Sequence, residues 1–90
     1  MSQKFLLHYA MTEAAGPGRA RHFAAHRARL QDFYDAGHLV GAGPVGVPPT
    51  GALGIFNSRA AVAEFVASGP FVLAGLIATH RIEEWNPAFL

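Results

Sequence analysis

Hydrophobic and polar positions follow two different periods along this chain. Residues 4–11 alternate one by one, as in a strand, and both resulting faces are largely apolar, which predicts a strand covered on two sides. Between Arg19 and Ala36 the period becomes helical, with apolar residues at steps of three and four. The predicted buried stripe of this helix consists of Phe23, His26, Leu30, Phe33 and Tyr34, and the water-facing side consists of Arg21, Ala25, Ala28, Asp32 and Asp35.

Turn-forming residues divide the rest of the chain into shorter elements. Loops are expected at residues 12–18, which contain Gly-Pro-Gly, and at 46–51, which contain Pro-Pro, and Gly37 is expected to end the helix in the left-handed conformation. Ser58 is a good N-cap for a second helix that runs to Ala67. The buried side of this helix is predicted to hold Ala61, Val62, Phe65 and Val66. Strands are predicted at 38–42, 52–56 and 77–85, and a short turn at 71–75.

The order of these elements predicts an α+β fold of the ferredoxin-like kind, βαββαβ, as a single domain over residues 1–90. In this fold a four-stranded antiparallel sheet carries both helices on one face. The other face of the first strand is also apolar, and soluble proteins rarely leave such a patch exposed. We therefore expect a homodimer that packs through its sheet faces.

Composition excludes several classes of function. The chain has 90 residues, 51% apolar and 14% charged, with a net charge of +1 and no cysteine. The absence of cysteine excludes disulfides, iron–sulfur clusters and a cysteine nucleophile. The basic residues of the first helix project in different directions, so no nucleic-acid partner is expected. The longest uncharged run, 36–58, holds six glycines and three prolines and could not span a membrane as a helix, so we expect a cytoplasmic protein without membrane contact.

His26 is the strongest candidate for chemistry because it interrupts an apolar stripe. Burial lowers the pKa of a histidine and keeps it neutral, the form that accepts a proton. The alternative is a core histidine with a structural hydrogen bond. An orienting carboxylate could come from Glu13, Glu64, Glu83 or Glu84, among which the sequence does not choose. A ring that is sealed from solvent, with no carboxylate in reach, would exclude catalysis.

A metal site is not expected. His22 and His26 have the i, i+4 spacing of two ligands on one helix, but Phe23 stands where the zincin pattern has glutamate, and no third ligand has a convincing spacing. No cofactor is expected either.

Five segments in order along the chain, HRARL, DAGHLVGAGP, GALGIF, GPFVLAGL and IEEWNP, resemble the YciI-like (YCII-related) family. The resemblance implies a ferredoxin-like, dimeric α+β-barrel fold. It also implies an enzyme site centred on the first-helix histidine, which is His26 here, and on an aspartate that precedes Pro-Phe. In this chain Gly69 takes the place of that aspartate, and Phe23 takes the place of an arginine three residues before the histidine.

Two hypotheses follow. In the first, His26 moves a proton on a small oxygenated metabolite, in lyase, isomerase or dehydrohalogenase chemistry without a cofactor, and Pro70 and Phe71 contact the substrate. In the second, the chain is a catalytically inactive dimeric module that binds a small molecule or serves a structural role. The residue at position 69 and the titration of His26 distinguish the two.

Overall fold

The computed structural model of the chain describes residues 3–12 and 15–90. Its elements occur in the order strand, helix, strand, strand, helix, short helix, strand. Four strands pair antiparallel in the order β2-β3-β1-β4. The bounds are β1 (Lys4–Met11), α1 (Ala15–Asp35), β2 (Leu39–Val45), β3 (Gly51–Phe56), α2 (Arg59–Ser68), α3 (Pro70–Leu73) and β4 (Ile77–Trp85).

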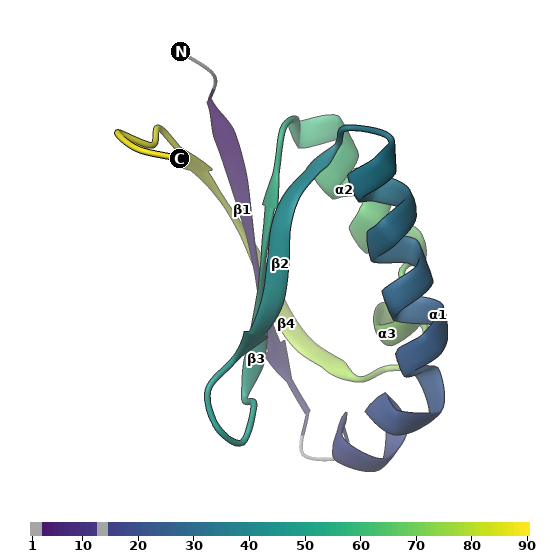
Figure 1. Cartoon of the computed structure of the whole chain (residues 1–90). Helices are drawn as coiled ribbons and strands as arrows, with labels where there is room; N and C mark the ends of the chain where they lie inside the picture. Colours follow the sequence, from purple (N-terminus) through teal and green to yellow (C-terminus); the bar gives the residue numbers. More distant parts are fainter. Residues whose placement is uncertain (1–2, 13–14) are drawn as a thin grey trace.

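The ferredoxin-like prediction is confirmed. The helices α1, α2 and α3 all lie on one face of the sheet, and the opposite face carries no helix (Figure 1). The bounds of β1 and β4 agree with the sequence prediction, and β3 begins one residue earlier, at Gly51. The short turn predicted after Gly69 is the single-turn helix α3.

The second strand is longer than predicted and starts later. It begins at Leu39 instead of His38 and continues through Pro44 to Val45. Proline is tolerated here because β2 lies at the edge of the sheet, where one side of the backbone pairs with no other strand. The turn residues that suggested an early end therefore occupy an edge strand.

The ends of α1 differ in how well the sequence predicted them. The helix begins at Ala15 instead of Arg19 and includes Pro17. A first helical turn accepts proline because an N–H at that position would have no partner within the helix, so its absence costs no hydrogen bond. Of the loop predicted at 12–18, residues 13 and 14 lie outside the described part of the chain. At the other end, Gly37 has the predicted left-handed conformation, with φ of 80°. The Ser58 cap of α2 is also confirmed, because its hydroxyl accepts a hydrogen bond of 3.1 Å from the N–H of Ala61.

The hydrophobic core lies between the sheet and the helices. Phe33 of α1, Phe56 of β3 and Phe65 of α2 meet there, with ring centroids 5.2 to 6.2 Å apart. The helix-facing side chains of β1, Leu7 and Tyr9, complete this cluster together with Leu39, Ala61 and Val62.

The predicted stripe of α1 is only partly buried. Phe33 is buried, and His26 and Leu30 are half-buried, whereas Phe23 and Tyr34 are 52% and 58% exposed. The prediction that Phe23 and Tyr34 are buried is wrong. At 100° per residue, their side chains project about 80° to 100° around the helix from the buried Phe33, so they lie at the edge of the buried face.

Arg29 links α1 to α2. Its Nη2 donates hydrogen bonds of 2.9 Å to the carbonyl oxygen of Glu64 and 2.8 Å to the hydroxyl of Ser68. The guanidinium also lies 5.0 Å and 5.5 Å from the ring centroids of Phe33 and Phe65, within the range of cation–π attraction. This basic residue therefore has a structural role.

The face of the sheet without helices carries apolar residues at its centre. Cross-strand register places Leu6 opposite Ile55, and His8 opposite Leu53. His8 Nε2 lies 2.7 Å from Glu83 Oε1, which Arg81 also contacts at 3.1 Å. Among the described helices, none is both long enough and apolar enough to cross a membrane.

Candidate functional site

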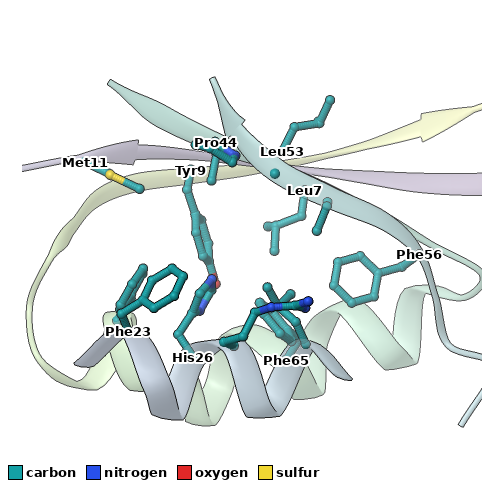
Figure 2. Close-up of a pocket in the computed structure, with 16 residues that line it drawn as sticks. Leu7, Tyr9, Met11, Phe23, His26, Pro44, Leu53, Phe56 and Phe65 are labelled. Atoms are coloured by element: carbon teal, nitrogen blue, oxygen red, sulfur yellow. The ribbon is translucent and has the colours of Figure 1, made fainter. Parts of the chain in front are cut away.

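A cavity of about 360 Å³ lies between the sheet and the middle of α1. Side chains from both layers point into it (Figure 2). Phe65 and Phe71 contribute from α2 and α3, and β1, β2, β3 and α1 contribute the other walls. Such a volume falls within the range of small-molecule sites.

Small residues on the helix-facing side of the sheet explain why this space is open. Cross-strand register places Ala42 beside Gly54, and Gly54 beside Leu7, while Ala52 lies opposite Tyr9. A Cβ atom at Gly54 would come within 2.9 Å of the Phe56 ring, so larger residues are excluded at that point. Short side chains under α1 leave a gap that the core does not fill.

His26 projects from α1 into this cavity (Figure 2). Its ring stacks on Phe71, with centroids 4.0 Å apart and planes 8° from parallel, and meets Phe65 edge-on at 6.2 Å. Burial lowers the pKa of His26 below its ordinary value because it removes water from the cationic form. At neutral pH the imidazole is therefore uncharged and able to accept a proton.

Tyr9 enters the cavity from the opposite wall, on β1 (Figure 2). The residue is 7% exposed, and its hydroxyl oxygen is buried with no hydrogen-bond partner among the described residues. Burial raises the pKa of Tyr9 to about 12, against a smaller opposing effect of the Arg29 charge. The hydroxyl thus stays protonated at neutral pH and can donate a hydrogen bond.

The cavity lining is otherwise almost entirely apolar. Tyr9, His26 and Arg27 carry its polar side chains, and no carboxylate is among the lining residues that the structure describes. Arg27 is exposed, which puts a positive charge at the rim. The cavity therefore offers one donor, one acceptor and one peripheral cation to a ligand.

None of the three described carboxylates considered from the sequence lines the cavity. Glu64 is exposed, Glu83 contacts His8 on the face without helices, and Glu84 pairs with Arg59 at 2.8 Å. Glu13 lies outside the described residues. Asp32 and Asp35 are exposed, as predicted. The His26 ring is half-buried and borders the cavity, so it is not sealed from solvent.

The two residues at the start of α3 that were expected to contact a substrate differ, because only one of them lines the cavity. Phe71 is buried, lines the cavity and covers one face of the His26 ring. Pro70 begins the helix and is not a lining residue. Gly69 is buried, and a Cβ atom there would lie 2.9 Å from the carbonyl oxygen of Phe65. The substrate contacts expected of Pro70 and Phe71 remain predictions.

Metal binding has no support in the described part of the chain. No group of three histidine, cysteine or glutamate/aspartate side chains comes together there in a way that could hold an ion. His22, one turn from His26, does not line the cavity.

Sequence reasoning missed Tyr9 as a site residue, and also Phe23 and Arg27. The strand pattern placed Tyr9 on a buried face but gave no sign that its hydroxyl would lack a partner. No usable signal was present, since the neighbours of a buried tyrosine hydroxyl depend on packing between the sheet and the helices that the strand pattern does not give. Phe23 was expected in the core, but it lines the outer part of the cavity.

The structure resembles several solved proteins. It superposes with a TM-score of 0.77 on 5-chloro-2-hydroxyhydroquinone dehydrochlorinase (TftG) from Burkholderia phenoliruptrix, solved in complex with 2,5-dihydroxybenzoquinone. The two sequences are 27% identical, and the match covers 92% of this chain and 93% of that one.

Two more distant structures share the fold alone. A protein from Agrobacterium tumefaciens is 18% identical, with a TM-score of 0.60 over 96% of this chain and 93% of that one. A hypothetical protein from Arabidopsis thaliana is 16% identical, with a TM-score of 0.52 over 99% and 90% of the two chains.

Sequence comparison identifies the family. No curated protein sequence matches the chain. The YCII-related domain, by contrast, matches residues 4–86, nearly the whole length. The chain belongs to the YCII-related (YciI-like) family.

Proposed function

We propose that this protein is an enzyme that uses His26 as a general base on a small oxygenated ring, without a cofactor. The observation that supports this most directly is the state of His26 itself. Its imidazole borders an apolar cavity, its pKa is lowered by burial, and no described residue hydrogen-bonds to it. A neutral histidine with free ring nitrogens beside a cavity is suited to proton abstraction.

The shape of the site supports a flat ligand. His26 and Phe71, whose rings stack in parallel, both line the cavity, and Phe23 adds a further aromatic side chain. Flat rings gain favourable contact against such surfaces. The likeness to TftG, crystallised with 2,5-dihydroxybenzoquinone, agrees with a ring of this kind.

The reaction class we favour is elimination of a halide from a hydroxylated ring, with isomerisation as the related alternative. One ring hydroxyl first becomes a carbonyl as its proton moves to the adjacent carbon that bears the halogen. His26 then takes the proton of the hydroxyl para to that carbonyl, and the electron pair of this O–H bond forms the second C=O bond. The electrons displaced through the ring leave with the halide as the carbon–halogen bond breaks. The products are a quinone, a halide ion and a protonated histidine, which returns its proton to solvent. This step consumes no oxidant.

A second function is favoured by one observation. None of the described lining residues is a carboxylate, so His26 has no anionic group to orient it or to stabilise its protonated form. A chain of this kind could bind the ring and release it unchanged. In that case the protein is a binding module without turnover.

Chloride release from 5-chloro-2-hydroxyhydroquinone, measured with wild type and with His26→Gln, tests the proposal. Wild type is expected to accelerate release above the buffer rate, and His26→Gln to lower the enzymatic rate at least about a hundredfold, as removal of a general base does. His22→Gln is the matched control, since this histidine lies on the same helix outside the cavity lining and its loss should leave the rate unchanged.

Two results oppose the enzyme assignment. Ring binding by wild type without chloride release or isomerisation favours the binding module. Equal rates for wild type and His26→Gln mean that catalysis, if present, does not depend on this histidine.

A further inference from the structure

The hydroxyl of Tyr9 is a polar group at a position where the surrounding packing needs only an apolar side chain. Its residue is more than nine-tenths buried, it packs in the main hydrophobic cluster, and the oxygen finds no hydrogen-bond partner among the described side chains and backbone. Leaving a buried hydroxyl without a partner costs folding free energy, and phenylalanine would fill the same volume without that cost. Packing alone therefore does not explain a tyrosine at this position.

The direction of the side chain suggests what the hydroxyl contacts. Tyr9 reaches from β1 across the cavity toward α1, and His26 reaches from α1 toward the sheet (Figure 2). Three polar side chains lie near Tyr9: His26 lines the same cavity, the His80 ring centroid is 6.5 Å from that of Tyr9, and the Arg29 charge acts on the hydroxyl. None of them makes a hydrogen bond to the Tyr9 oxygen. The remaining source of a partner is the content of the cavity.

We propose that the Tyr9 hydroxyl donates a hydrogen bond to an oxygen atom of the bound ring, and that Tyr9 thereby determines specificity for oxygenated over apolar rings. The inference rests on the proposed function, because it concerns the ligand of the same cavity. Tyr9 supplies a donor on the strand side, and His26 supplies an acceptor on the helix side. The ligand class that fits is a ring with a carbonyl oxygen and a hydroxyl group on different carbons.

The apolar surroundings of the Tyr9 hydroxyl strengthen the preference for oxygenated over apolar rings. The Tyr9 hydroxyl oxygen is covered by neighbouring side chains, so a ligand oxygen reaches it only as those side chains move aside. The bond then forms with little competing solvent. A ring without oxygen leaves the hydroxyl unpaired, and sites built around such a donor reject ligands that lack the matching group. The Tyr9 hydroxyl stays a donor at neutral pH because burial raises its pKa to about 12.

Binding of two rings to Tyr9→Phe tests the inference. 2,5-Dihydroxybenzoquinone carries the required oxygens, and p-xylene has a similar ring without them. Nuclear magnetic resonance titration is expected to give about tenfold weaker binding of the quinone to Tyr9→Phe than to wild type, which corresponds to the loss of one hydrogen bond. Binding of p-xylene should be unchanged or tighter.

The chain offers a matched control. Tyr34, the other tyrosine of the sequence, is 58% exposed and lies outside the cavity lining, so Tyr34→Phe should bind both rings as wild type does. Thermal unfolding supplies a readout without ligand. Because the hydroxyl has no protein partner, Tyr9→Phe should melt at the wild-type temperature or above it.

Four results overturn the inference: unchanged quinone affinity in Tyr9→Phe, equal weakening for both rings, a clear fall in melting temperature, and a wild-type chain that binds no quinone at millimolar concentration. These outcomes are separate from those of the proposed function. Chloride release that depends on His26 but not on Tyr9 would refute the specificity role alone, whereas quinone binding that depends on Tyr9 without any turnover would refute the enzyme alone.

Discussion

The imidazole of His26 lies parallel to the ring of Phe71, 4.0 Å away and inclined by 8°. Phe71 is 4% exposed, so the contact covers one face of the imidazole with a buried apolar ring. The ring nitrogens lie at the edge of the stack and make no hydrogen bond to a described residue. The arrangement fixes the plane of the base but leaves its polar edge available.

Acidification is expected to destabilise the protein through His26. Burial lowers the pKa of His26 in the folded state, whereas the unfolded chain takes up the proton near the ordinary value of about 6.5. Below that pH the unfolded state binds more protons, so the free energy of unfolding falls as the pH decreases. Above it, His26 contributes no pH dependence. Urea unfolding at a series of pH values between 5 and 8 measures the slope.

Two histidine variants test whether His26 causes the dependence of the free energy of unfolding on pH. His26→Gln should reduce the loss of stability on acidification, and His22→Gln should retain it because His26 is still present. The direct measurement is the titration of the His26 ring protons by nuclear magnetic resonance. A midpoint above the ordinary histidine range contradicts the prediction.

Replacement of His26 by alanine should cost little stability. The side chain is half-buried, has no hydrogen bond to a described residue and makes two aromatic contacts, which together predict a loss of about 1 kcal/mol in the free energy of unfolding. Turnover, in contrast, should be lost. Urea denaturation beside the chloride-release assay measures both effects, and a loss above about 2 kcal/mol would favour a packing role for the histidine.

The element order could be predicted from the sequence because the hydrophobic periodicity and the turn residues indicate the same sequence of strands and helices. The alternation at residues 4–11 and the Ser58 cap correspond to β1 and α2 as observed. Gly37 ends α1 with the expected positive φ. Errors occurred where tertiary position overrides a local signal, as in Pro44, which an edge strand accepts.

The candidate site could be predicted only in part. An isolated polar residue in an apolar stripe pointed to His26, and the structure puts it beside a cavity. The cavity itself could not be predicted, because it depends on Ala52 and Gly54 lying under α1 across a sheet whose register the sequence does not give. The unpaired hydroxyl of Tyr9 is a consequence of the same geometry.

We expect two chains to associate through the sheet face that carries no helix. Leu6 and Ile55 lie opposite each other there, and neither is fully buried in the single chain. Pairing two such faces would remove apolar surface from water. Sedimentation should therefore give a concentration-dependent species of twice the mass of the 9.6 kDa chain.

A charge on this face should separate the two chains. Ile55→Lys is expected to shift the protein to the monomer because the ammonium would be buried between the sheets. Val47→Lys is the control, since Val47 is fully exposed at the β2–β3 turn and should leave the mass unchanged. Wild type that sediments as a monomer at all concentrations would refute this association.

Restoring a carboxylate at position 69 should change the titration of His26. Gly69 directly precedes Pro70 and Phe71, and the family resemblance assigns an aspartate to this position. In Gly69→Asp, a negative charge near the imidazole should raise the pKa of His26, because an opposite charge favours the protonated form. If the lack of an orienting carboxylate limits the reaction, chloride release should also accelerate.

Any side chain at position 69 meets a steric clash, so the control for Gly69→Asp must introduce a side chain of the same size. A Cβ atom at Gly69 would lie 2.9 Å from the Phe65 carbonyl oxygen, so the backbone of α2 or α3 must shift and the protein should lose stability by about 1 kcal/mol. Gly69→Asn has the same shape without the charge and should show the same loss, with less change in the His26 titration. If aspartate and asparagine move the His26 midpoint equally, the charge does not reach the imidazole, and position 69 acts through packing alone.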